Sequence, residues 1–115
     1  MKRFKYALQG IRVLFDKDHH FAVHLLFALL VAAAGFLFGL NTLEWLFIIG
    51  AVFIVLISEV VNTSVEYTVD LVTDEFHELA KRAKDTSALA VLLASLYAAI
   101  TGLIIFIPKI IVFFT

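Results

Sequence analysis

The sequence predicts an all-α membrane protein in which three helices cross the bilayer and an N-terminal amphipathic helix lies on its surface. Of the 115 residues, 63% are hydrophobic, and the mean hydropathy is +1.02. An ordinary soluble domain has roughly 45–50% apolar residues, and a chain this short has too little interior to bury so many large side chains. Three runs approach or exceed the about 20 apolar residues that a spanning helix needs. We therefore expect a single membrane domain over residues 1–115.

The first expected element is a surface helix over residues 1–16. Basic side chains at Lys2, Arg3, Lys5 and Arg12 alternate there with aromatic and aliphatic ones. This spacing gives a helix with one charged and one apolar face, the pattern of a helix that lies at the membrane interface.

The three expected spans cover residues 21–40, 45–72 and 88–107. Only His24 interrupts the first run, and the third contains only mildly polar residues before Pro108, which is expected to end or kink the helix. The stretch "NTLEW" joins the first two spans as a short turn, with Trp45 suited to the interface. A charged loop over residues 73–87 joins the second span to the third.

Lysines and arginines indicate which side of the membrane each connection occupies. Eight precede the first span or lie in the 73–87 loop, and only Lys109 falls on the other side. The positive-inside rule places the N-terminus and the 73–87 loop in the cytoplasm. A net charge of −1 gives no electrostatic reason to expect a nucleic-acid partner, and a chain without cysteine has no thiolate chemistry.

The second span carries an unusual set of polar residues, Glu59, Asn62, Glu66 and Asp70. Successive residues of a helix are rotated by about 100°, so these four fall on one stripe. A stripe of carboxylates that faces lipid is costly, so it is expected to face protein, water or a metal ion. From the residues alone it fits a structural ion network, a proton or cation path, or a site for a hard divalent cation.

The 73–87 loop brings further charged residues close to this stripe, including Lys84. Carboxylates that hold Mg²⁺ and a lysine that neutralises phosphate are the parts that phosphoryl transfer needs. Neither a G-x-x-x-x-G-K-[ST] loop nor a protein-kinase signature is present in the sequence. His20 and His24 have an i,i+4 spacing that suits zinc, but two ligands do not make a site, and interfacial histidines are the expectation.

The stretches "EVVNTSVEYTVDLV" and "EFHELAKRAKDTSALAVLLA" resemble the E-x-x-N-[ST]-x-[IV]-E-x-x-x-D and H-x-L-[AS]-x-x-A-K-D signature of the small prokaryotic diacylglycerol kinase family. The resemblance extends over nearly the whole chain, from "FKYALQGI" to "IPKI". "HLLFALLV", "LAKRAKD" and "IPKI" look closer to its undecaprenol kinase branch.

This resemblance implies a homotrimer in the bacterial cell membrane, with active sites at subunit boundaries near the cytoplasmic face. It implies transfer of the γ-phosphate of MgATP to a lipid hydroxyl, that of undecaprenol or, as the alternative, of diacylglycerol. By motif position, Glu59 is the general base, Asn62 helps to orient it, and Glu66 and Asp18 bind the metal. The implied nucleotide contacts are Tyr6, Glu75, Phe76, His77, Lys84 and Asp85.

The sequence departs from the family pattern before and after the signature. Asp18 stands where Glu is common, with Asp16 as an alternative metal ligand, and His20, Ala22 and Leu89 replace an amide, a basic residue and a small residue. These changes raise the prospect of altered lipid choice or weaker activity. Without the resemblance, a small oligomeric proton or cation conductor would explain the acidic stripe as well as a lipid kinase does, and a membrane adaptor is a third interpretation.

Overall fold

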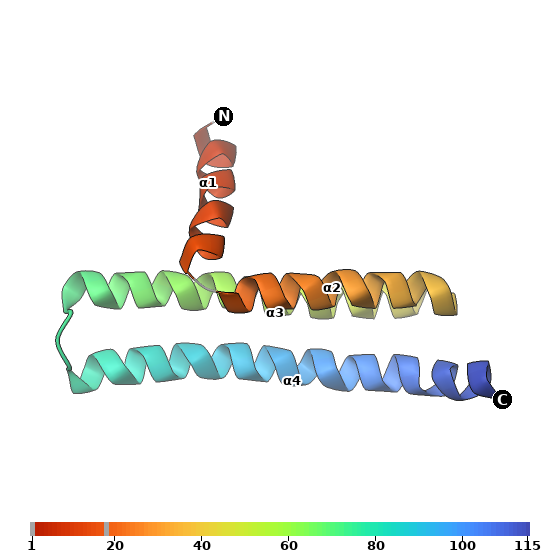
Figure 1. Ribbon diagram of the computed structural model, residues 1–115. Coiled ribbons are helices and arrows are strands. Elements are labelled where there is room, and N and C mark those ends of the chain that lie inside the picture. The colour runs from red at the N-terminus through yellow and green to blue at the C-terminus, as the bar shows by residue number, and fades with distance from the viewer. Residues whose placement is uncertain (1, 18) are drawn as a thin grey trace.

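The computed structural model describes residues 2–17 and 19–115, and nearly all of them are helical. The four helices are α1 (Lys2–Lys17), α2 (His19–Phe38), α3 (Thr42–Val72) and α4 (Glu78–Phe114). Figure 1 shows α2, α3 and α4 running along one common direction, with α1 set across them. The last three helices are each long and apolar enough to cross a membrane. The predicted all-α membrane architecture is therefore confirmed.

The spans differ from their predicted bounds, most of all the third. Helix α4 begins at Glu78 instead of residue 88, so only residues 73–77 form the loop. The His77 side chain caps this helix, because its Nδ1 accepts a hydrogen bond from the Leu79 N–H at 3.1 Å. Of the two effects expected of Pro108, an end or a kink, the end is wrong, since α4 continues to Phe114. A proline inside a helix removes one N–H donor, and α4 continues despite that loss.

The short turn between α2 and α3 is fixed by a capping box. Asn41 accepts a hydrogen bond from the Glu44 N–H at 2.9 Å, and the Glu44 carboxylate accepts one from the Asn41 N–H at 3.0 Å. Such reciprocal bonds satisfy two of the N–H groups that a helix start leaves unpaired. Glu44 also forms an ion pair with Lys109 of α4 at 3.0 Å, so this end of α3 is tied to α4.

A small apolar core packs α2, α3 and α4 together at the same end. It is formed by the buried Leu40, Ile48 and Ile105, against which Trp45 packs. The Trp45 ring lies against Gly35 of α2, where an added Cβ would come within 2.5 Å of the indole. The absence of a side chain at Gly35 therefore permits this close packing.

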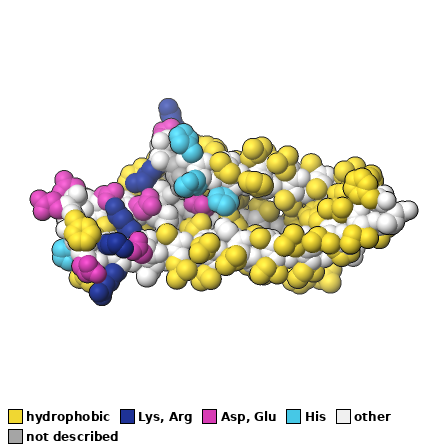
Figure 2. All heavy atoms as spheres, turned by 60° about the horizontal axis from the view of Figure 1, so that its bottom comes forward, with side chains coloured by type: hydrophobic (Ala, Val, Ile, Leu, Met, Phe, Trp, Pro, Cys, Tyr) yellow, Lys and Arg dark blue, Asp and Glu magenta, His cyan; other side chains and the backbone are white. Residues whose placement is uncertain are grey.

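Charged and apolar side chains occupy different parts of the surface. Figure 2 shows lysines, arginines, acidic residues and histidines gathered at the α3–α4 loop end and around the base of α1, while apolar side chains cover most of the remaining length. Forty-one large hydrophobic residues are exposed on the described chain, a distribution that suits a protein surrounded by lipid or by further copies of itself.

Candidate functional site

The polar stripe of α3 becomes more exposed from its middle toward the α3–α4 loop. Glu59 is 3% exposed and Asn62 is 9% exposed. The side chains of Glu66 and Asp70 are 35% and 47% exposed. Glu59 is thus the carboxylate withdrawn furthest from water, whereas Asp70 lies beside the polar end of the protein.

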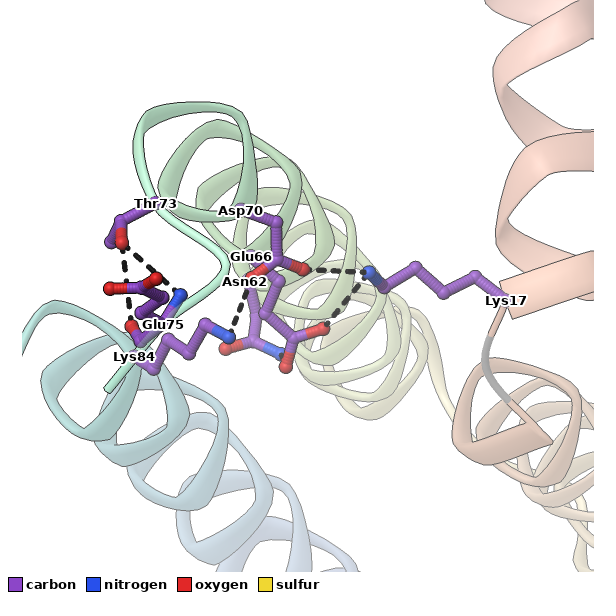
Figure 3. Close-up of polar contacts among 7 residues, drawn as sticks. All are labelled: Lys17, Asn62, Glu66, Asp70, Thr73, Glu75 and Lys84. Carbon is purple, nitrogen blue, oxygen red and sulfur yellow. Dashed lines mark hydrogen bonds and ion pairs between the residues drawn. The ribbon is translucent and has the colours of Figure 1, made fainter. Parts of the chain in front are cut away.

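Contacts along the stripe confirm that Asn62, Glu66 and Asp70 share one side of α3. The Asn62 amide donates a hydrogen bond to Glu66 Oε1 at 3.4 Å. Lys17, at the end of α1, reaches over to the same side, where its Nζ lies 4.0 Å from Glu66 Oε2 and 3.9 Å from Asp70 Oδ2, as Figure 3 shows. The Lys17 ammonium also lies 3.9 Å from the centroid of the Tyr67 ring.

A cavity of about 390 Å³, here called the inner cavity, opens beside Glu59. All four helices contribute to its lining. The lining residues are Lys17, His20, Glu59, Asn62, Glu66, Ala88 and Val91. The inner cavity therefore brings together the residues predicted as base, orienting amide and metal ligand.

A second cavity of about 340 Å³, here called the loop cavity, lies between the ends of α3 and α4. It gathers five of the six residues expected at the nucleotide: Glu75, Phe76, His77, Lys84 and Asp85. The sixth, Tyr6, is 62% exposed on α1 and lines neither cavity.

The loop cavity is connected to the stripe through Asp70, which also lines it. Lys84 Nζ lies 2.8 Å from Asp70 Oδ1, and Lys81 Nζ lies 2.6 Å from Asp85 Oδ2. Figure 3 shows Lys84 extending from α4 toward the same α3 face that Lys17 approaches from α1. Lysines from two helices, Lys17 of α1 and Lys84 of α4, thus place positive charge next to the exposed end of the stripe.

The structure adds two residues that the sequence did not single out for the site, Lys17 and His24. Lys17 was counted only among the positive charges that set the orientation. His24 was expected to be an interfacial histidine, whereas its Nε2 lies 3.0 Å from Glu59 Oε1. One indication of a role for His24 was present in the sequence, where it is the only polar residue in the run 21–40.

Glu66 and Asn62 are the described residues of the inner cavity that could hold a magnesium ion together with phosphate groups. Mg²⁺ is commonly bound by one or two carboxylates together with substrate phosphates, so a complete protein cage is not needed. Glu66 offers a partly exposed carboxylate, and the neighbouring Asn62 Oδ1 is buried without a hydrogen-bond partner among the described residues. Within residues 2–17 and 19–115, no group of three or more His, Asp or Glu side chains is placed to hold a metal.

The other predicted or departing residues take different positions. Asp18, the expected second metal ligand, lies outside the described residues. His20 lines the inner cavity, where the family has an amide. Asp16 and Leu89 are exposed, and Ala22 is half-buried on α2.

Comparison with known proteins identifies similar sequences over most of the chain. The sequence model of the prokaryotic diacylglycerol kinase family matches residues 5–106. An undecaprenol kinase of Bacillus subtilis (strain 168) is 41% identical over 111 residues, covering 94% of this chain and 88% of that protein. A diacylglycerol kinase of Synechocystis sp. is 37% identical over 106 residues, covering 91% of this chain and 61% of that protein.

A diacylglycerol kinase of Escherichia coli (strain K12) is 30% identical over 105 residues, covering 91% of this chain and 86% of that protein. The similarity therefore extends over the surface helix, the three spans and both cavities. The chain belongs to the prokaryotic diacylglycerol kinase family.

Proposed function

We propose that this protein is an integral-membrane lipid kinase that transfers the γ-phosphate of ATP to the hydroxyl of undecaprenol. The observation that carries the proposal is the inner cavity, where a carboxylate that is 3% exposed lies next to residues suited to metal and phosphate. Undecaprenol is preferred as acceptor because the identity to an undecaprenol kinase, 41%, exceeds the 37% and 30% to the two diacylglycerol kinases. Diacylglycerol is the alternative acceptor.

In this proposal Glu59 acts as the general base. An alcohol is a weak nucleophile, and a carboxylate placed next to it accelerates its attack by taking the hydroxyl proton in the transition state. The lipid O–H bond breaks as the oxygen bonds to the γ-phosphorus, and the bond from that phosphorus to the β-phosphate oxygen breaks to release ADP. Asn62, one turn along α3, helps to orient the reacting groups.

The loop cavity is proposed to hold the nucleotide. Its exposed loop residues Glu75, Phe76 and His77 would contact the base and the sugar of the nucleotide, and Lys84 would face the phosphates. Glu66, with Asp18, would hold Mg²⁺, which when bound offsets negative charge on the transferring phosphoryl group. Because Glu66 lies between Glu59 and Asp70 on one helix face, phosphates in the loop cavity would point toward Glu59, the general base.

The membrane orientation and the assembly are part of the same proposal. Lys17 contacts Asp70, so the end of α1 lies on the same side of the protein as the α3–α4 loop. By the positive-inside rule this side faces the cytoplasm, which contains ATP, while the acceptor lipid arrives laterally within the bilayer. We propose the cell membrane as the location and a homotrimer as the assembly, on the strength of the family resemblance and of the many exposed apolar side chains.

An acceptor comparison in lipid vesicles tests the proposed function. Purified protein is given γ-labelled ATP and Mg²⁺, with undecaprenol and diacylglycerol offered separately, together, or omitted. We expect label to appear in undecaprenyl phosphate and to follow undecaprenol in the competition. Transfer mainly to diacylglycerol would overturn the acceptor assignment, and ion flux without phosphate transfer to either alcohol would overturn the kinase proposal.

A further inference from the structure

We propose that His24 is a positioning residue for phosphoryl transfer, because its Nε2–H donates a hydrogen bond that holds the Glu59 carboxylate in the orientation needed to take the acceptor proton. This inference rests on the proposed function, since it concerns the base of that reaction. It adds a second residue of α2, besides His20, to the site.

The geometry joins two different spans. His24 Nε2 lies 3.0 Å from Glu59 Oε1, within the range of a hydrogen bond. The Glu59 side chain is 4% exposed and the His24 side chain 29% exposed, so the contact lies inside the protein, next to the inner cavity. Residues 24 and 59 are far apart in the sequence, so packing of α2 on α3 creates this contact.

The role of Glu59 determines which atom donates. A carboxylate must be ionised before it can accept a proton, and an ionised carboxylate is only an acceptor of hydrogen bonds. The hydrogen between the two side chains must then be carried by His24 Nε2. By donating this hydrogen bond, the ring nitrogen holds one oxygen of the Glu59 carboxylate in place.

A base is effective only within hydrogen-bonding reach of the proton that it removes. Glu59 lines the inner cavity from α3, and the contact with His24 on the neighbouring span limits the rotation of its flexible side chain. A base oriented by a further polar group recurs among enzymes that activate hydroxyl nucleophiles. Lys17 directs its charge to Glu66 and Asp70 farther along the stripe, and His24 contacts Glu59 itself.

Two substitutions separate the hydrogen bond from the bulk of the side chain. His24→Leu keeps an apolar side chain of similar size without a donor, and His24→Gln places an amide N–H near the position of Nε2. His19→Leu is the matched control, since His19 is exposed on the same helix. Steady-state kinetics in vesicles give kcat and KM for ATP and for undecaprenol.

We expect His24→Leu to lower kcat by about 10- to 100-fold, the range for losing a hydrogen bond to a charged group, with both KM values within about twofold. His24→Gln should recover most of the lost kcat, and His19→Leu should match the unmodified protein. A folded His24→Leu protein with full kcat would overturn the proposal. Equal losses in the Leu and Gln variants, or a change confined to KM, would overturn it as well.

Two further measurements test the proposal if His24→Leu does not fold or if the unmodified protein transfers no phosphate. If His24→Leu does not fold, His24→Asn takes its place in the comparison. The asparagine amide N–H lies near the position of Nδ1, whereas the glutamine amide lies near that of Nε2. Equal kcat values in the Asn and Gln variants would contradict the proposal. The ¹⁵N NMR signals of the His24 ring report the hydrogen bond without any turnover. We expect a protonated Nε2 whose signal shifts in Glu59→Leu, and an unprotonated or unaffected Nε2 would refute the contact. An unmodified protein inactive on every acceptor but showing this shift would instead count against the proposed function.

Discussion

Replacing Lys84 with methionine is expected to weaken the use of ATP without disrupting the fold. Lys84 extends from α4 into the loop cavity, and its side chain is 42% exposed. Its ammonium already has a partner, Asp70 at 2.8 Å, so phosphates must replace an existing interaction. The net gain from the phosphates therefore lies at the low end of the range for charged hydrogen bonds, and we expect kcat/KM for ATP to fall about tenfold.

A double-mutant cycle with Asp70→Asn separates the two roles that Lys84 can have. If Lys84 binds phosphate, Lys84→Met lowers kcat/KM for ATP in both the natural and the Asp70→Asn backgrounds. If Lys84 serves only to neutralise Asp70, its replacement has no effect once Asp70 has lost its charge. Initial rates at varied ATP and saturating lipid measure all four proteins, with Arg82→Gln as a control on the exposed face of the same helix. An unchanged kcat/KM in Lys84→Met, or a loss that disappears in the Asp70→Asn background, would refute the assignment.

Three other changes test separate parts of the structure. Lys17→Met removes the cation over the Tyr67 ring and its contacts with the acidic residues of α3. It should lower the free energy of unfolding, measured by detergent titration, by about 1 kcal/mol. An unchanged free energy would show that these contacts do not hold α1 against α3. Gly35→Ala places a methyl group against the Trp45 ring and should destabilise the protein by about 1–3 kcal/mol, while Gly102→Ala, with open space around it, should not; equal effects on thermal unfolding would contradict this packing. Chelation of divalent ions should abolish phosphate transfer and leave the helical circular dichroism signal intact, and transfer that survives chelation would exclude the proposed use of Mg²⁺.

The sequence was sufficient to predict the helices and the polar stripe, because both follow from short-range periodicity. Long apolar runs predict spans, and a rotation of about 100° per residue places Glu59, Asn62 and Glu66 on one face. The start of α4 was predicted ten residues too late because its charged first turns were assigned to the loop. Ion pairs four residues apart, such as Lys81 with Asp85, support helical structure in that segment.

The contacts of Lys17 and His24 could not be predicted from local patterns. Lys17 belongs to α1, and its contacts with Glu66 depend on the angle at which α1 crosses the spans. His24 reaches Glu59 only because α2 packs on α3 in one particular rotation. Spacing within one helix determines which residues share a face, but it does not determine which faces meet.

The most direct test of the central claim is the rate of phosphate transfer to the lipid by Glu59→Gln under saturating ATP and acceptor. Glutamine keeps the size of the side chain and removes its ability to take a proton, so we expect kcat to fall by about 10²- to 10⁴-fold. Binding of a non-hydrolysable ATP analogue should be unchanged, and Glu78→Gln, at an exposed carboxylate at the start of α4, should retain full activity. A Glu59→Gln protein that transfers phosphate at the unmodified rate would contradict the assignment of Glu59 as the base.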